Sequence, residues 1–315
     1  METATFDFDI TDGPGQAAAY WINTRDNIRL RIAVWNNVSH SSGTVFVLPG
    51  RGDCAERFGR AASLFAENDF TTMVIDWRGQ GGSQRLVEDP LVGHVEKFSD
   101  YQIDVLAVVD AAKRLKLPEP WYLVGHSMGA CIGLRALKNS LPVNACAFTA
   151  PMWNIKISPI QRLLAWPVSW AAKTFGQGHS YVPGNKTSER KSYVLSVAFE
   201  DNRLTNDRDM YSYMVKIATH LPDCQTAAPS LGWLYESLKE CWSLSKESSP
   251  DMPCITFCGD GDELVDLDAA RDRMSRWGKG TFELVKNSKH DVLSEFPAIR
   301  RSVVSKMCEL FKNSP

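Results

Sequence analysis

Short β-rich runs alternate with helical patterns along most of the chain, and this alternation constrains the fold more than any other feature. The strands predicted from these runs cover Ala19–Thr24, Ile28–Trp35, Thr44–Leu48, Thr71–Asp76, Trp121–Val124, Val143–Thr149, Cys254–Cys258 and Thr281–Val285. Helical spacing of apolar residues predicts helices over Cys54–Glu67, Tyr101–Leu115, Met128–Asn139 and Ala298–Phe311. Such alternation is typical of a mostly parallel sheet flanked by helices. We therefore predict an α/β fold with an eight-stranded, mostly parallel sheet.

The alternation breaks between Pro151 and about Ser245. This stretch has several helical patterns, scattered prolines and no clear strand, and it holds half of the ten tryptophans. Because this stretch lies between the sixth and seventh predicted strands, it looks like an insertion into the sheet domain. We predict a core made of residues 1–150 and 246–315, with a helical cap at 151–245 inserted after the sixth strand.

Composition excludes several classes of protein. Apolar residues make up 44% of the 315-residue chain and charged residues 23%, which is ordinary globular usage. The 35 basic and 37 acidic residues leave a net charge of −2, which gives no sign of a nucleic-acid partner. The first ten residues lack the positive start of a secretory signal, and no apolar run approaches the ~20 residues of a membrane helix. We expect a cytoplasmic protein, and the oligomeric state stays open.

Eight cysteines lie in the chain without any CxxC pair. Several of them fall inside apolar runs, as Cys146 does in Val143–Thr149. Free cysteine packs like a small hydrophobic residue. We predict buried free thiols and no metal site.

The pentapeptide Gly125-His126-Ser127-Met128-Gly129 fits the G-x-S-x-G pattern and lies between a predicted strand and a predicted helix. At so sharp a strand-to-helix turn the backbone comes too close for side chains at the flanking positions, so glycine is needed there. The turn exposes the serine hydroxyl at a helix N-terminus, where free amides favour developing negative charge. The pattern predicts that Ser127 is a nucleophile.

A serine nucleophile needs a base, and the base needs an acid to orient it. In this architecture the chain order is serine, then acid, then histidine. His290 is the only histidine after the insertion, and it follows the last predicted strand. The acid is expected after Cys254–Cys258, where Asp260, Asp262 and Asp266 compete, and position alone does not separate them.

These residues together resemble the α/β-hydrolase superfamily. The Gly-His-Ser-Met-Gly elbow, the pattern Gly-x-x-Asp-x-x-x-Asp from Gly259 and the late His290 carry that resemblance. Less specific motifs are similar to its bacterial lysophospholipase and monoacylglycerol-lipase-like branch: Leu48–Gly52, Asp76–Ser83, Gly93–Val95, Asp100–Gln102, Asn202–Thr205 and Gly232–Leu234. The resemblance covers nearly the whole chain.

The resemblance implies that Asp262 is the acid of the triad and that Asp266 is structural. It also implies an oxyanion hole made of the backbone amides of Met128 and Arg51. Relatives often carry His-Gly-x at the second position, where this chain has Pro49 in place of the histidine. The donor is a backbone amide, so this departure leaves the hole in place.

The Arg51 side chain has two interpretations. It senses an anionic head group of the substrate, or it forms a salt bridge with a neighbour such as Asp53, which is the commoner arrangement. The stretch Asp76–Ser83 resembles the loop of the family that carries a buried arginine.

The resemblance implies two-step hydrolysis of a small-molecule or lipid ester through an acyl-enzyme, with no cofactor or metal. A lysophospholipase or a monoacylglycerol lipase is the favoured function. A short-chain carboxylesterase, a peptidase, a thioesterase or an acyltransferase on the same fold are the alternatives. A non-catalytic scaffold is disfavoured because every member of the triad is present.

The cap segment Ile157–Phe175 is strongly apolar, and its only charges are Arg162 and Lys173. Large aromatic residues suit an acyl chain or a membrane interface, which predicts substrate contacts and a peripheral contact with the inner membrane face. The alternative is a cap helix packed on the core. Pro167 predicts a break into two short helices. The predicted substrate contacts are Trp153, Trp166 and Trp170.

Overall fold

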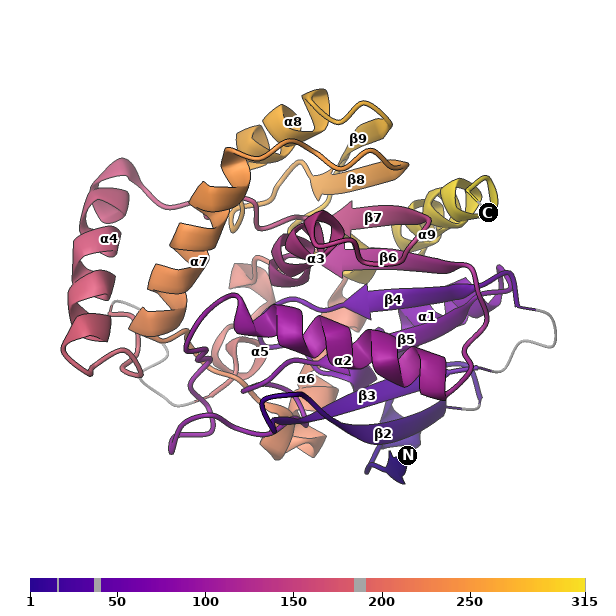
Figure 1. The fold of residues 1–315 in the computed structure, drawn as a ribbon, viewed down its shortest axis with the longest axis horizontal. Coiled ribbons are helices and arrows are strands. Elements are labelled where there is room, and N and C mark those ends of the chain that lie inside the picture. The colour runs from indigo at the N-terminus through magenta and orange to yellow at the C-terminus, as the bar shows by residue number, and fades with distance from the viewer. Residues whose placement is uncertain (16, 37–40, 184–190, 315) are drawn as a thin grey trace.

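The computed structural model describes residues 1–15, 17–36, 41–183 and 191–314 and contains a single twisted sheet with helices on both faces (Figure 1). Its strand order is β1-β2-β3-β5-β4-β6-β7-β8-β9. The first three strands and the β3–β5 pair are antiparallel, and all pairs from β5 to β9 are parallel. The strands are β1 (Glu2–Thr3), β2 (Ala17–Asn23), β3 (Arg29–Trp35), β4 (Thr44–Leu48), β5 (Thr71–Asp76), β6 (Trp121–His126), β7 (Ala145–Thr149), β8 (Cys254–Gly259) and β9 (Gly280–Val285).

The predicted α/β fold is confirmed, with one correction to the strand count. The described residues contain nine strands and not eight, because Glu2 and Thr3 pair with Trp21 and Tyr20 of β2. Both residues of β1 are exposed. A two-residue edge strand with no buried face leaves no alternating hydrophobic pattern in the sequence, so the prediction could not include it.

Helices connect the parallel strands, as the alternation predicted. The helices of the core are α1 (Gly59–Ala66), α2 (Asp100–Arg114), α3 (Met128–Lys138), α8 (Leu267–Ser275) and α9 (Pro297–Lys312). Between β7 and β8 lie α4 (Pro159–Thr174), α5 (Tyr193–Ser196), α6 (Arg208–His220) and α7 (Leu231–Ser245). Short 3-10 turns are η1 (Phe8–Ile10), η2 (Ala55–Phe58), η3 (Phe199–Asp201), η4 (Pro222–Cys224) and η5 (Val292–Ser294). The helix predicted over Cys54–Glu67 therefore starts as a 3-10 turn.

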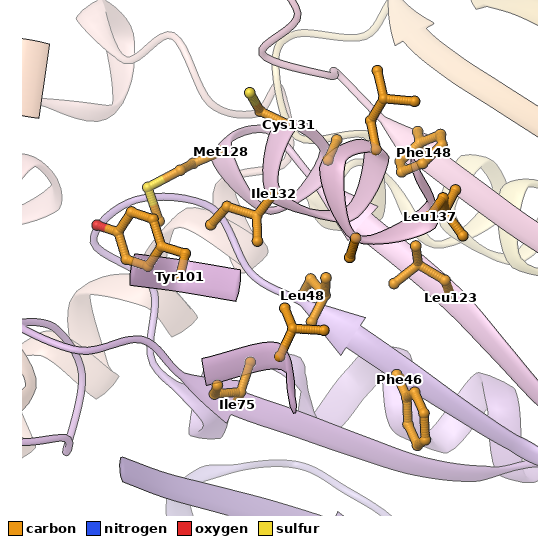
Figure 2. Close-up of a cluster of buried hydrophobic side chains, with 14 of the residues drawn as sticks. Phe46, Leu48, Ile75, Tyr101, Leu123, Met128, Cys131, Ile132, Leu137 and Phe148 are labelled. Atoms are coloured by element: carbon orange, nitrogen blue, oxygen red, sulfur yellow. The ribbon is translucent and has the colours of Figure 1, made fainter. Parts of the chain in front are cut away.

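Both faces of the central strand β4 are buried, and its side chains alternate between two hydrophobic cores. Phe46 and Leu48 point to the face covered by α2 and α3, where Ile132 of α3 packs over Leu48 (Figure 2). Val45 and Val47 point to the opposite face, which α1 and α9 cover. A fully buried side chain of this size contributes roughly 1.5–3 kcal/mol. Burial on both faces fixes the strand, and hence the loop that follows it.

The helices between β7 and β8 fall into two groups. α7 packs against α3, and α4 packs against α7 on the side away from the sheet, beyond the carboxyl ends of the parallel strands (Figure 1). α6 belongs instead to a separate apolar cluster with Ile10 and Cys54, close to the N-terminal part of the chain.

Pro167 does not break α4, contrary to the sequence prediction. The helix runs from Pro159 to Thr174 with Pro167 inside it. A proline removes the hydrogen bond to the carbonyl four residues earlier, and here that residue is the exposed Leu163, whose carbonyl water can reach. A capping box between Ser158 and Gln161 closes the first turn.

The eight cysteines are all buried free thiols, which confirms the prediction made for them. In the part of the chain that the structure describes, no helix combines the length and the apolar character needed to cross a bilayer.

Candidate active site

Ser127 lies at the turn between β6 and α3, the place that the pentapeptide pattern predicts. Its backbone has φ +51° and ψ −115°, a conformation that non-glycine residues rarely adopt. A Cβ on Gly129 would lie 1.9 Å from the Leu48 carbonyl oxygen, and one on Gly125 would lie 2.8 Å from the Ala130 Cα. Both glycines are therefore required by close packing of the turn.

Hydrogen bonds to the neighbouring strand hold this strained turn. The Ser127 amide donates to the Thr149 carbonyl at the end of β7, at 3.0 Å. The Ser127 carbonyl accepts from the amides of Ala130, at 3.0 Å, and Met152, at 3.1 Å. The backbone of the nucleophile candidate is thus tied to α3 and to the chain leaving β7.

The side chains of Ser127, His290 and Asp262 come together in one hydrogen-bonded row. His290 Nε2 lies 3.0 Å from Ser127 Oγ, and His290 Nδ1 lies 2.8 Å from Asp262 Oδ2. His290 is 4% exposed and Asp262 is 2% exposed. Ser127 precedes the other two residues by more than a hundred positions, yet all three meet at the carboxyl ends of β6, β8 and β9, with His290 within hydrogen-bond reach of both partners.

The geometry distinguishes the three aspartates that the sequence left in competition. Asp262 alone contacts the imidazole. Asp260 accepts from the Ser288 amide at 3.3 Å. Asp266 caps the N-terminus of α8 and accepts from the Asn154 amide group at 2.8 Å. The structural role expected for Asp266 agrees with this cap.

The carboxylate of Asp262 is stabilised in its ionised form. Burial opposes the charge, but the hydrogen bond and charge of His290 and the amides of Leu264 and Val265 outweigh burial and lower the pKa of this carboxyl. An anionic Asp262 facing Nδ1 keeps the proton of His290 on that nitrogen. Nε2 is then free to accept a hydrogen bond from the Ser127 hydroxyl.

The loop that carries His290 is held by the inserted segment, which sequence reasoning did not predict. The His290 amide donates to the Arg203 carbonyl at 3.3 Å, and the next amide donates to the Leu204 carbonyl at 2.9 Å. The fully buried Glu295 accepts from the amides of Lys289, at 2.7 Å, and Asn206. The sequence indicated only that Asn202–Thr205 is similar to a stretch of the family. In the structure this stretch supports the histidine loop.

The loop after β4 lies against the nucleophile. A Cβ on Gly50 would lie 3.3 Å from the Ser127 Cβ. Three buried side chains fix this loop: Asp53 accepts from the Gly50 amide at 2.9 Å, Gln80 from the Gly52 amide at 2.6 Å, and Trp77 donates to the Pro49 carbonyl at 2.9 Å. Within the described residues, the backbone amides of Arg51 and Met128 donate to no protein acceptor.

Asp53 does not pair with Arg51, which corrects one of the two interpretations of Arg51. Asp53 instead forms an ion pair with Arg57, and Arg57 also pairs with Asp291, the residue after His290. This network joins the loop after β4 to the histidine loop. Arg51 donates to the Ala227 carbonyl at 2.7 Å. The loop arginine expected to be buried is Arg78, which contacts Asp104.

His126 has a structural position beside the nucleophile. Its Nδ1 lies 3.0 Å from Thr149 Oγ1, and burial lowers its pKa to about 4, so the ring is neutral. The described residues contain no cluster of three or more His, Cys, Asp or Glu side chains that would hold a metal ion.

The three tryptophans predicted to contact substrate lie in different environments. Trp153 is 4% exposed, stacks on Trp277 and donates to the Ala130 carbonyl, which is the environment of a core residue. Trp166 packs edge to face on Tyr235 of α7, and Trp170 is 52% exposed. The structure gives no support to a substrate contact by Trp153, and the predictions for Trp166 and Trp170 stay predictions.

Comparison with known proteins gives relatives along nearly the full chain. Lysophospholipase L2 of Escherichia coli K12 is 26% identical over 308 residues, covering 92% of this chain and 86% of the relative. A probable lysophospholipase L2 of Haemophilus influenzae is 25% identical over 263 residues, covering 82% and 80%. The structure of a soluble variant of monoglyceride lipase from Saccharomyces cerevisiae superposes with a TM-score of 0.72 at 15% identity, covering 94% of each chain.

These findings confirm the resemblance to the α/β-hydrolase superfamily and its lysophospholipase and monoacylglycerol-lipase-like branch. They also support the predicted class of an ester-hydrolysing serine hydrolase. The model of one family, described as serine aminopeptidase S33, matches residues 39–297, which hold every member of the hydrogen-bonded row. With more than half of its length matched, the chain belongs to this serine aminopeptidase S33 family of α/β-hydrolases.

Proposed function

We propose that this protein hydrolyses carboxylic esters of lipids, lysophospholipids or monoacylglycerols, through an acyl-enzyme on Ser127. The observation that carries the proposal is the row Ser127–His290–Asp262, with contacts of 3.0 and 2.8 Å. The E. coli and H. influenzae relatives, named lysophospholipases, support the lipid ester as substrate. Ser127 is the nucleophile, His290 the general base and acid, and Asp262 the group that orients the imidazole.

In the first half-reaction the hydroxyl proton of Ser127 passes to His290 Nε2 as Oγ attacks the ester carbonyl. The carbonyl oxygen becomes an oxyanion, which the backbone amides of Met128 and Arg51 stabilise. The imidazolium is stabilised by the Asp262 carboxylate. When the intermediate collapses, the bond to the alcohol oxygen breaks, and His290 donates its proton to the departing alcohol.

In the second half-reaction a water molecule attacks the acyl-enzyme. His290 takes one proton from this water, the oxyanion forms again, and its collapse releases the fatty acid while the proton returns to Ser127 Oγ. The Asp53–Arg57–Asp291 network holds the loop after β4 and the histidine loop in place relative to each other, since it contacts both. No step needs a metal or a cofactor.

The inserted residues 151–245 supply the cap of the proposed enzyme. Their α4 presents large apolar side chains to solvent, among them Ile160, Leu163 and Leu164. The charged residues of the predicted apolar segment are positive, Arg162 and Lys173. Lys173 is paired with Glu236, so the apolar face carries the argument and not these charges. An exposed apolar helix face suits a lipid surface from which the substrate is extracted, and this supports a peripheral contact with a membrane.

The test is a substrate panel with wild-type protein and Ser127→Ala. The panel holds p-nitrophenyl esters of increasing chain length, a monoacylglycerol, a lysophospholipid and aminoacyl anilides. Wild type is expected to prefer the long-chain lipid esters, and Ser127→Ala is expected to lose about 10⁴–10⁶ in kcat. The substitution removes a single hydroxyl, so circular dichroism and the thermal midpoint should stay those of the wild type.

Different results separate the alternatives. Residual turnover of Ser127→Ala above a few per cent would contradict the nucleophile assignment. Preference for acetyl esters or aminoacyl anilides would leave the nucleophile in place and replace the lipid substrate by that of a short-chain esterase or a peptidase. Acyl transfer to an added alcohol in preference to water would identify an acyltransferase.

A further inference from the structure

We propose that the side chain of Arg51 binds the phosphate group of the ester substrate, so that the protein acts on lysophospholipids in preference to neutral monoacylglycerols. This inference rests on the proposed function and narrows its substrate class. It starts from the position of a partly buried guanidinium, rooted in the loop beside Ser127, without a carboxylate partner in the described structure.

The contacts of Arg51 leave most of its binding capacity unused. A guanidinium has five N–H donors. Within the described residues, Nη1 donates to the Ala227 carbonyl at 2.7 Å and lies against Gly93, where an added Cβ would come within 3.0 Å. The guanidinium centre is 5.7 Å from the Trp233 ring. One carbonyl and one aromatic ring do not balance the charge, although they hold the planar group in a fixed orientation.

The buried and partly buried arginines of the described residues include a group neutralised by carboxylates and a group that donates to backbone carbonyls. Two buried arginines each contact two carboxylates: Arg31 with Glu56 and Asp76, and Arg78 with Asp26 and Asp104. Arg85, Arg273 and Arg300 donate to backbone carbonyls, as Arg51 does. Arg51 is the member of this second group whose own backbone belongs to the loop against Ser127.

The charge of Arg51 persists at neutral pH despite its burial. Loss of solvent lowers the pKa of the guanidinium to about 10, which still leaves it protonated near pH 7. A cation that has lost part of its water and has no counter-ion binds an incoming anion more strongly than a hydrated one does. Phosphate fits a guanidinium in a two-pronged arrangement, which a neutral glycerol cannot make.

The position of Arg51 links this anion site to the reacting bond. Its backbone amide is the second proposed oxyanion donor, so its side chain starts beside the carbonyl under attack. From there the side chain ends between Gly93 and Trp233, at the N-terminal turn of α7. A substrate whose ester carbonyl occupies the oxyanion site therefore brings its head group within one side chain's reach of this guanidinium.

The competing explanation is that Arg51 only braces the inserted segment at Ala227. The chain offers a matched control, because Arg85 donates to the carbonyls of Asp223 and Gln225, just before Ala227 in the same segment. A bracing role predicts the same behaviour for both arginines. A phosphate-binding role predicts that they differ.

The experiment compares lysophosphatidic acid with the monoacylglycerol of the same acyl chain, both in micelles of one neutral detergent. The readout is the ratio of the two kcat/KM values, since any disturbance of the loop amide acts on both substrates. Arg51→Gln is expected to lower this ratio about 10- to 100-fold, as loss of a hydrogen-bonded charge does. Arg51→Lys should recover part of it because the point charge remains. Arg85→Gln should leave the ratio unchanged.

A binding measurement keeps the inference separate from the proposed function. In the Ser127→Ala background, the Kd of lysophosphatidic acid should rise about 10- to 100-fold with Arg51→Gln, whether or not the wild type turns the lipid over. Failure of turnover with this binding difference intact would count against the proposed function alone. An unchanged ratio and Kd in Arg51→Gln would overturn the phosphate site. An equal loss in Arg85→Gln would overturn it as well. Inorganic phosphate binding as tightly as the lipid would overturn the assignment of the site to the head group of a lipid substrate.

Discussion

The helices α3 and α4 are both rich in apolar residues, and they use them in opposite ways. In α3 the apolar side chains are buried, among them Leu134 and also Ile132, which lies over the sheet in Figure 2. In α4 several of the largest are exposed, with Leu163 at 75%, Ile160 at 74% and Trp170 at 52%. Folding accounts for the sequence of α3 because burial stabilises the native state.

Folding does not account for the outer face of α4. The helix needs an apolar stripe toward α7, and the capping box supplies its first turn, but exposed leucines on the far side add nothing to the free energy of unfolding. The comparison teaches that composition alone cannot distinguish a buried helix from an interacting one. The two kinds of helix are distinguished only by what packs against each face of the helix in the structure.

The largest expected effect lies on the buried side of this comparison, at the partner of His290. Asp262→Asn should lower kcat about 10⁴-fold, because an amide in place of the carboxylate favours the wrong tautomer of the imidazole. Asp260→Asn is the control, since it changes the same group two residues away, and Asp260 contacts the Ser288 amide and Lys286 but not the imidazole. Steady-state kinetics of both variants on one ester decide the matter, and the reverse ranking would move the triad to Asp260.

A matched pair of leucines tests the contrast between the two helices directly. Leu134 of α3 is 1% exposed, and Leu134→Ala should lower the free energy of unfolding by about 2–5 kcal/mol. Leu163→Ala, the same change on α4, should alter it by less than about 0.5 kcal/mol. Urea unfolding of the two variants measures both values.

Leu163→Ala, which should hardly change stability, should have a clear effect on the turnover of a membrane-bound substrate. If the outer face of α4 contacts lipid, Leu163→Ala should reduce turnover of a long-chain ester held in vesicles about tenfold, and leave turnover of a soluble butyrate ester unchanged. Equal turnover of the vesicle ester by Leu163→Ala and wild type would remove the membrane contact from the proposal.

The last expected effect, a dependence of stability on pH, concerns the buried His126. Its pKa is about 4 in the folded protein, against about 6.5 for an exposed histidine, so between these values the unfolded chain binds a proton that the folded protein does not. Stability supplied by the neutral ring is therefore complete above pH 6.5 and is lost as the pH falls toward 4, by at most about 3 kcal/mol. The charged or titratable groups around the ring are Asp291, His290, Arg57 and Asp262.

Urea unfolding of wild type and His126→Asn between pH 4 and 7 measures this contribution. The difference in unfolding free energy between the two should shrink as the pH falls through that window. The exposed His220 offers the control variant His220→Asn. A difference that stays constant across the window would mean that His126 is not held neutral by burial.

The sequence predicted those features that leave a local pattern. The strands of the parallel part alternate with amphipathic helices, and the elbow needs Gly125 and Gly129 at fixed offsets from Ser127, so each could be identified from neighbours along the chain. The α8 helix was not predicted, because only Ala270, Arg273 and Met274 are buried and most of its residues are charged or polar.

The features that were missed depend on contacts between distant segments. Three aspartates of one loop look alike in sequence, so only the family resemblance pointed to Asp262, and the direction of each side chain in the structure separates them physically. The ion pair of Arg57 with Asp291 and the support of the histidine loop by the carbonyls of Arg203 and Leu204 join positions that lie far apart in the chain, and no periodicity encodes such contacts. Trp153 was grouped with the cap by its position in the chain, whereas its ring packs in the core.

The backbone of Ser127 has a consequence for how such a chain changes over generations. At φ +51° a glycine would have less backbone strain than a serine. The proposed nucleophile therefore occupies a position where folding favours glycine, which has no reactive side chain. Replacement of Ser127 by glycine would thus relieve backbone strain, and selection for well-folded protein does not oppose it. If Ser127 is the nucleophile, selection for turnover is what retains the serine, and a descendant without that selection would keep the fold and lose the activity.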